Sequence, residues 1–134
     1  DPLGSKANQF FRNIAGKLFI NQTAPTLTGD TGYGQGVAVA DINQDGFADL
    51  LVANLGPNIL YLNNGDGTFT RQVLVAPNKS GEWTSSIACG DLSGDQLPEI
   101  VEVNYINDPS AMTVPCTSTH VSCNPNDFQS ACLW

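Results

Sequence analysis

The chain has 134 residues, 41% of them hydrophobic, and its five basic and thirteen acidic residues give a formal net charge of −8. That length predicts one structural unit with a modest core. The acidic excess argues against a nucleic acid or an anionic membrane surface as partner, because both are bound by basic residues, and it is compatible with a divalent cation. No apolar run approaches the roughly twenty residues of a membrane-spanning helix, so membrane insertion is not expected.

The predicted elements are short strands, and no segment shows helical periodicity. Residues 1–9 are expected to be a leader or a cloning remnant. Residues 10–25 contain two short apolar segments and predict a hairpin, whereas residues 26–35 predict a turn-rich linker. The later strands are predicted over residues 37–40, 50–53, 59–62, 68–75, 87–89 and 100–103. The fold is therefore predicted to be all-β.

Two acidic loops connect predicted strands. The first places four oxygen-bearing side chains around a glycine turn, namely Asp41, Asn43, Asp45 and Asp49. The second repeats that spacing with Asp91, Ser93, Asp95 and Glu99. Oxygen ligands around such a turn are what a hard cation takes, and carboxylates this close would repel one another without one. The loops therefore predict two Ca²⁺ sites.

The second loop lies fifty residues after the first, and the same offset relates positions far from the loops. It pairs Asp41 with Asp91, Asp45 with Asp95, Asp49 with Glu99, Tyr33 with Trp83, Asn54 with Asn104, Phe11 with Tyr61, Asn13 with Asn63, and Phe19 with Phe69. One unchanged offset across distant pairs predicts tandem repeats. Each repeat has about four short strands, the content of one propeller blade.

The stretch GVAVADINQDGFADLLVAN, followed by ILYLNNGDGTF, resembles an FG-GAP/VCBS repeat, the calcium-binding blade of integrin-α-type β-propellers. It is especially similar to repeats of the ASPIC/UnbV, cartilage-acidic-protein type. The resemblance implies tandem four-stranded antiparallel blades with Ca²⁺-binding loops between strands. It implies an outer hairpin and linker over residues 10–35, repeat 1 over 36–82, and an incomplete repeat 2 with a cysteine-bearing insertion over 83–134.

The resemblance also implies the ligands of both sites. In loop 1 the four side chains would act with the carbonyl of Phe47, and in loop 2 with the carbonyl of Leu97. Loop 2 departs from the pattern, because Ser93 replaces an Asp or Asn and Gln96 occupies the usual glycine position. The second site is therefore expected to be weaker.

The four cysteines form no Cys-x-x-Cys motif, and three of them lie in the last nineteen residues. In an oxidising compartment Cys116 is expected to pair with Cys123, and Cys89 with Cys132; free thiols are the alternative. Cysteine density, together with the extracellular use of calcium modules, predicts a secreted or cell-surface protein. Asn21 and Asn78 are N-glycosylation acceptors by sequence. They matter only if the source organism glycosylates its proteins.

The acidic loops have two alternative interpretations. An EF-hand needs a bidentate glutamate at its twelfth position and flanking helices, but counting from Asp41 that position is Val52, within a strand pattern. Turns without metal are the simpler alternative, because Asn, Asp and Gly dominate turns.

Catalysis is not expected. His120, the only histidine, lies between two cysteines in an irregular segment, and the sequence has no nucleophile elbow and no phosphate-binding loop. Aromatic residues could line a carbohydrate site, although repeat-equivalent aromatics are more often blade core; the candidates are Tyr33, Trp83, Phe19 and Phe69.

The repeats are incomplete, since the hairpin in residues 10–35 matches the part that repeat 2 lacks. Free sheet edges invite complementation by another strand. The hairpin is expected to pair within the chain, with further blades of a longer protein, or with a second copy head to tail, which would form a filament. The predicted function is a secreted Ca²⁺-binding module with a structural or adhesive role; a self-assembling filament subunit and a carbohydrate-binding domain are the alternatives.

Overall fold

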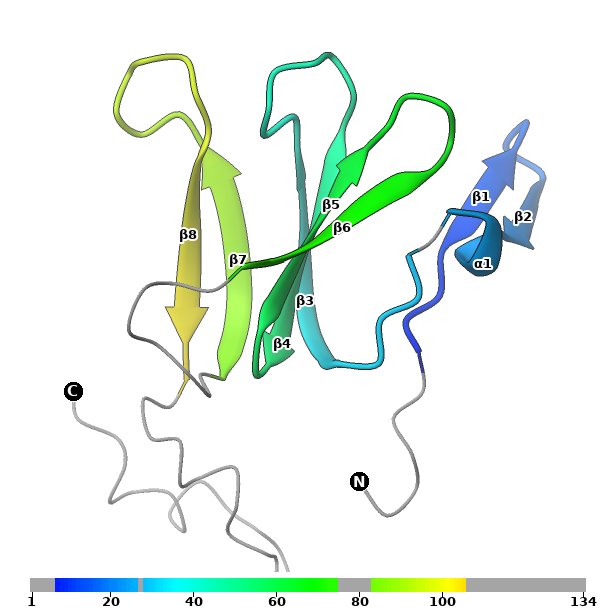
Figure 1. The fold of residues 1–134 in the computed structure, drawn as a ribbon, viewed down its shortest axis with the longest axis horizontal. Helices are drawn as coiled ribbons and strands as arrows, with labels where there is room; N and C mark the ends of the chain where they lie inside the picture. The colour runs from blue at the N-terminus through cyan, green and yellow to red at the C-terminus, as the bar shows by residue number, and fades with distance from the viewer. Residues whose placement is uncertain (1–6, 27, 75–82, 106–134) are drawn as a thin grey trace, which may run out of the picture.

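The structure is a computed structural model and describes residues 7–26, 28–74 and 83–105. In these ranges eight short strands form three antiparallel sheets, which stand side by side in chain order (Figure 1). The predicted all-β fold with blade-like antiparallel sheets is therefore confirmed. Within the same ranges, no helix is long and apolar enough to cross a membrane.

The elements follow one another in three groups. The first is a hairpin of β1 (Phe11–Ile14) and β2 (Leu18–Asn21), followed by a single helical turn, α1 (Thr23–Thr26). The central sheet contains β3 (Tyr33–Ala40), β4 (Asp49–Leu55), β5 (Asn58–Asn63) and β6 (Phe69–Leu74), in that order. The third sheet pairs β7 (Thr84–Gly90) with β8 (Glu99–Asn104).

Strand registers repeat with the predicted offset of fifty. Phe11 lies opposite Asn21 in the first hairpin, as Tyr61 lies opposite Arg71 in β5–β6. The β7–β8 pair likewise repeats β3–β4, down to the register irregularity between residues 34 and 36, which returns between residues 84 and 86. The β1–β2 hairpin is thus the counterpart of β5–β6, and β7–β8 is the counterpart of β3–β4.

The core lies on both faces of the central sheet, because side chains along a strand alternate between faces. On the face toward β7, here called the β7 face, the buried cluster contains Leu51, Ala53, Leu60 and Ile87, with Cys89 and Ile100 packed against it. On the opposite face, here called the hairpin face, Ile59, Tyr61 and Phe69 pack against Phe10. Buried apolar contacts therefore hold both the β7–β8 sheet and the segment leading into the β1–β2 hairpin against the central sheet.

Two sequence predictions about the segment before the first acidic loop were wrong. Strand β3 begins at Tyr33, inside the predicted linker, because Tyr33 and Gly34 pair with the end of β4. The helical turn α1 was also not expected. It is held by a hydrogen bond from the Thr26 amide to the Gln22 carbonyl (2.9 Å), and four residues are too few to show helical periodicity.

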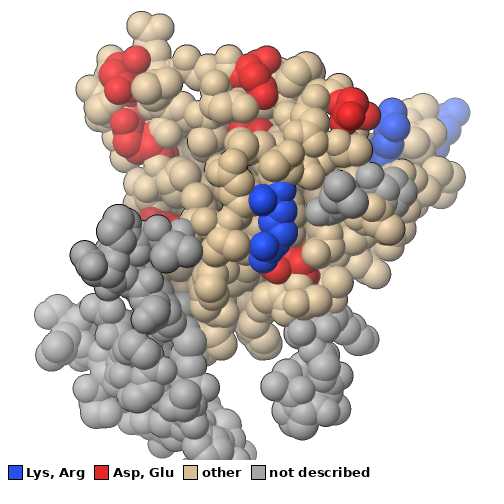
Figure 2. Space-filling view, viewed as in Figure 1, with Lys and Arg blue, Asp and Glu red and all other residues tan. Residues whose placement is uncertain are grey.

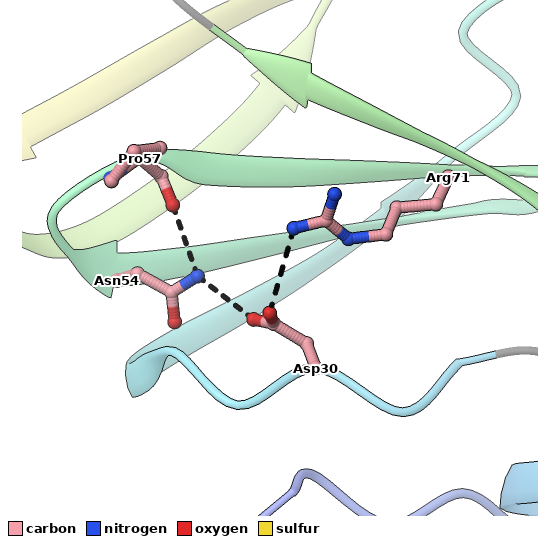
Figure 3. A network of polar contacts seen from close by, with 4 residues as sticks. All are labelled: Asp30, Asn54, Pro57 and Arg71. Atoms are coloured by element: carbon pink, nitrogen blue, oxygen red, sulfur yellow. Dashed lines mark hydrogen bonds and ion pairs between the residues drawn. The ribbon is translucent and has the colours of Figure 1, made fainter. Parts of the chain in front are cut away.

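A polar network ties the segment before β3 to the central sheet (Figure 3). The buried Asp30 carboxylate accepts a hydrogen bond from Asn54 Nδ2 (3.0 Å) and lies 3.7 Å from Arg71 Nη2. Asn54 Nδ2 also donates to the Pro57 carbonyl (3.1 Å). Asp30 is therefore a buried charge with partners on two strands.

Candidate metal centre

Loop 1 joins β3 to β4 and is built around Asp41. The Asp41 carboxylate accepts hydrogen bonds from the amides of Asp45 (Oδ1, 3.1 Å) and Gly46 (Oδ2, 2.9 Å). Two residues of the loop adopt the left-handed backbone conformation, Gln44 (φ 58°) and Gly46 (φ 88°). These turns direct successive amides inward, so the loop closes around its first acidic side chain.

Asn43 and Asp45 lie within the same turn. Asp45 Oδ1 accepts from the Phe47 amide (2.9 Å), and its Oδ2 accepts from Asn43 Nδ2 (2.8 Å). Asn43 Oδ1 accepts from the Asp45 amide (3.2 Å). The structure thus brings three predicted ligands, Asp41, Asn43 and Asp45, into one hydrogen-bonded loop.

Asp49 closes the loop from the first residue of β4 and is completely buried. Its Oδ2 accepts from the Ile42 amide, and its Oδ1 accepts from the Asn63 amide at the end of β5, both at 2.8 Å. Asn63 also donates from Nδ2 to the Ala48 carbonyl (3.1 Å). Sequence reasoning missed this role of Asn63, whose signal was its place at the head of the Asn-Asn-Gly-Asp-Gly turn.

Loop 2, between β7 and β8, repeats three of these hydrogen bonds at the offset of fifty. Asp91 accepts from the Gln96 amide (2.9 Å), as Asp41 does from Gly46. The other two bonds run from the Leu97 amide to Asp95 (2.8 Å) and from the Leu92 amide to Glu99 (2.6 Å). Although Ser93 and Gln96 depart from the family pattern, loop 2 keeps the backbone shape of loop 1.

Hydrogen bonding favours the charged form of two carboxyl groups on this side of the molecule. The Leu92 amide, followed by Ser93, lowers the pKa of Glu99 below its usual value. The hydroxyl and amide of Thr68 lower the pKa of Asp66, in the turn between β5 and β6. Both groups therefore remain anionic near neutral pH.

The two loops lie next to each other. The Gln44 side chain of loop 1 donates a hydrogen bond to the Gln96 carbonyl of loop 2. Both loops and the β5–β6 turn lie along one edge of the three sheets, where acidic side chains gather (Figures 1 and 2). This edge therefore concentrates negative charge.

The donor chemistry of each loop fits a hard cation. A carboxylate offers about four lone-pair positions, and the bonds described use only some of them. Within the described ranges no three His, Cys, Asp or Glu side chains form a metal cluster. A cation in loop 1 would therefore also need the side-chain oxygen of Asn43 and the backbone carbonyl of Phe47. A set made only of oxygen donors suits Ca²⁺ better than a transition metal.

The left-handed residues of the loops suggest a stabilising substitution. Loop 1 has Gln44 and Gly46 at these two positions, whereas loop 2 has Gly94 and Gln96. Replacing Gln96 by glycine is expected to raise the free energy of unfolding by about 0.5–1 kcal/mol, because a side chain in this conformation is strained. Urea denaturation would measure it, with Gly94→Ala as the opposite control; a loss of stability in Gln96→Gly would contradict the prediction.

The remaining predicted site residues have different outcomes. Phe69 is buried in the core, whereas Phe19 and Tyr33 are exposed, and Trp83 packs edge-on against Tyr105 with ring centroids 5.6 Å apart. Asn21 is exposed at the end of β2. Within the described part of the chain Cys89 forms no disulfide, and burial raises the pKa of its thiol. Its predicted partner, Cys132, lies outside the described residues. The other sequence candidates outside them are Asn78, Cys116, His120 and Cys123. The disulfide pairings stay predictions.

Comparison with known proteins agrees with this architecture. No curated protein matches the chain. A family model described as FG-GAP-like repeat matches twice, over residues 3–52 and 41–102, and the two matches together span most of the chain. The narrower resemblance to the ASPIC/UnbV type stays a prediction. With its repeated registers and loops, the chain belongs to the FG-GAP-like repeat family.

Proposed function

We propose that the chain is a secreted or cell-surface Ca²⁺-binding repeat module with a structural or adhesive role and no catalytic activity. The observation that carries the proposal is that the same carboxylate-to-backbone loop is built twice, each time between paired strands. Membership in the FG-GAP-like repeat family supports it.

The proposed ligands come from this chain's own loops. In loop 1 they are the side chains of Asp41, Asn43, Asp45 and Asp49 with the Phe47 carbonyl, and in loop 2 those of Asp91, Ser93, Asp95 and Glu99 with the Leu97 carbonyl. A bound cation would supply positive charge to the three carboxylates proposed as ligands in each loop. It would hold both strand connections in one conformation and so stiffen the module.

The proposal includes a partner for the sheet edges. Strand β8 pairs only with β7 among the described strands, while β4, its counterpart, pairs on both sides. A further blade or another copy of the chain would complete that edge.

Calcium is expected to raise the melting temperature of the protein, and EDTA to reverse the increase. At a Ca²⁺ concentration one hundred times the dissociation constant, the stabilisation would be about 2.7 kcal/mol. Mg²⁺ should have little effect, because it demands a smaller octahedral site. Thermal unfolding followed by circular dichroism provides the measurement.

Two variants assign the effect to the loops. Asp45→Ala should lose the part of the calcium response that loop 1 supplies. Asp66→Ala removes the same charge from the same edge but outside both loops, and it should keep the full response. Equal melting temperatures in EDTA and in Ca²⁺ for the unmodified chain would refute the proposed function.

A further inference from the structure

We infer that a second copy of this chain inserts its β7–β8 sheet beside the first copy's β1–β2 hairpin, and that repeated insertion closes a ring of two to four copies. The inference rests on the proposed structural role of the module, but not on its calcium. Within one copy, the central sheet packs against the β7–β8 sheet. The offset of fifty gives each side of that contact a counterpart, one on β8 and the other on β3.

The first of these surfaces is on β8. Inside one copy, Leu51 and Ala53 of β4 are covered by the β7–β8 sheet and are 0% exposed. Their counterparts on β8, Val101 and Val103, are 41% and 54% exposed. The same apolar stripe that binds a neighbouring blade in repeat 1 therefore has no covering sheet among the described residues in repeat 2.

The second surface is on the hairpin face of β3. Inside one copy, Ile87 of β7 is buried against the central sheet, with Cys89 packed beside it. Their counterparts on β3, Val37 and Val39, are 65% and 61% exposed. Val37 lines a groove of about 440 Å³ whose other walls include Leu50, Val52 and the segment Gln9–Phe10.

These two surfaces match each other. The cluster on the β7 face joins Leu51 and Ala53 to three residues of the next sheet: Ile87, Cys89 and Ile100. Shifting these five residues by fifty joins Val101 and Val103 of the inserting copy to Val37, Val39 and Leu50 of the receiving copy. All five shifted residues are apolar, so the contact between copies would reproduce the contact within one copy.

Strand pairing leads to the same insertion. In the central sheet, Leu51 of β4 lies opposite Leu60 of β5. The shifted pair is Val101 of the inserting copy opposite Phe10 of the receiving copy, and Phe10 lines the groove. Insertion of β8 beside the hairpin of another copy would therefore both extend the sheet at β8 and fill the groove. A single copy cannot make this contact with itself, because β8 and the β1–β2 hairpin lie on opposite sides of the molecule (Figure 1).

A polar contact has a counterpart as well. Buried Asp49 accepts a hydrogen bond from the amide of Asn63, at the end of the strand that pairs with β4. The shifted pair is Glu99 of the inserting copy and the Asn13 amide of the receiving copy. Glu99 uses Oε2 for its bonds to Leu92 and Ser93, which leaves Oε1 for this donor.

The inserting sheet and the β1–β2 hairpin beside it carry opposite charges, although loop 1 of the receiving copy is acidic. Residues 7–29 contain two basic residues and no acidic one, Arg12 and Lys17. Residues 83–105 contain four acidic residues and no basic one, Asp91, Asp95, Glu99 and Glu102. Opposite charges favour encounter between these surfaces and disfavour pairing of like with like, so the contact is head to tail.

The geometry of the contact decides between a ring and a filament. If the contact between copies repeats the contact between the sheets of one copy, each copy turns by the same angle as successive blades do. Blades related in this way close, typically at four to eight per ring. Since each copy spans two repeats, two to four copies would close the ring, a closed assembly in place of the filament that is one alternative from the sequence.

The test is the mass in solution by sedimentation over a concentration series, with two variants at exposed positions so that each copy still folds. The unmodified chain is expected to form one species of two to four copies. Val37→Asp and Val103→Asp should each be monomeric, and an equal mixture should form a one-to-one dimer, because each variant supplies the surface that the other lacks. Asn64→Asp, in the exposed β5–β6 turn and outside the contact, should assemble normally.

A monomeric unmodified chain, a polymer without limiting size, or a mixture that stays monomeric would each overturn the inference. Circular dichroism of the variants separates misfolding from lost association. Calcium-dependent melting of monomeric Val103→Asp tests the proposed function separately: a calcium response without rings rejects only the assembly, and rings without a calcium response reject only the metal.

Discussion

Replacing Asp49 by alanine is expected to lower the free energy of unfolding by about 3 kcal/mol or more. Asp49 is fully buried, and its two oxygens accept hydrogen bonds from the amides of Ile42 and Asn63. Each bond to a charged acceptor contributes about 1.5–3 kcal/mol, and the substitution leaves both amides without their acceptor. Urea denaturation in EDTA, in the monomeric Val37→Asp background, measures this loss apart from any contribution of calcium or association.

Glu99→Ala is the matched control for this prediction, because Glu99 is the repeat counterpart of Asp49. Its hydrogen bonds to the Leu92 and Ser93 amides lie at the solvent-exposed surface of loop 2. Water can replace them, so the loss of stability in EDTA should be much smaller than for Asp49→Ala. Equal losses for the two variants would show that burial of Asp49 does not matter.

The offset of fifty explains why so much of the fold could be predicted. If Asp41 matches Asp91 and Phe11 matches Tyr61, the strands of the two repeats should pair in the same register. The structure shows this: β1–β2 has the register of β5–β6, and β7–β8 has that of β3–β4. Strand ends were less predictable. Tyr33 is in β3 because its partner Leu55 extends β4, a contact between distant residues that local pattern does not encode.

Contacts between segments also limited the prediction of buried polar groups. The pairing of Asp30 with Asn54 and Arg71 depends on how the segment before β3 lies across the sheet. The repeats differ here too: Asn104 Oδ1 accepts from the Thr84 hydroxyl (2.8 Å), whereas buried Asn54 Oδ1 has no hydrogen-bond partner. Glycine at position 34, the counterpart of Thr84, removes that donor.

The candidate site was predicted at the level of residues, but its internal bonding was not. Alternating Asp and Asn residues marked loop 1, and Asp, Ser and Asp marked loop 2; in loop 1, Asp41, Asn43 and Asp45 lie in one hydrogen-bonded turn. The sequence predicted a weaker second site because Ser93 replaces an Asp or Asn and Gln96 replaces a glycine. Gly94, however, takes the other left-handed position, so each loop has one glycine and one glutamine in that conformation.

Leu51→Ala is expected to lower the free energy of unfolding by about 3 kcal/mol, within the range of 2–5 kcal/mol for buried leucines. Leu51 is 0% exposed at the centre of the contact between the central sheet and β7. Removing its side chain leaves a cavity that packed neighbours on both sheets fill only in part. The change should be made in the monomeric Val37→Asp background, because association would otherwise make stability depend on protein concentration.

Val101→Ala in that same background is the matched control, since Val101 is the repeat counterpart of Leu51 but is 41% exposed. Its effect on unfolding should be below about 1 kcal/mol, because little apolar surface is uncovered. In the unmodified chain, by contrast, Val101→Ala should weaken association, because there Val101 takes the place that Leu51 has within one copy. A large loss of stability from Val101→Ala in the monomer would mean that its side chain is already buried against its own chain, and it could not serve a second copy.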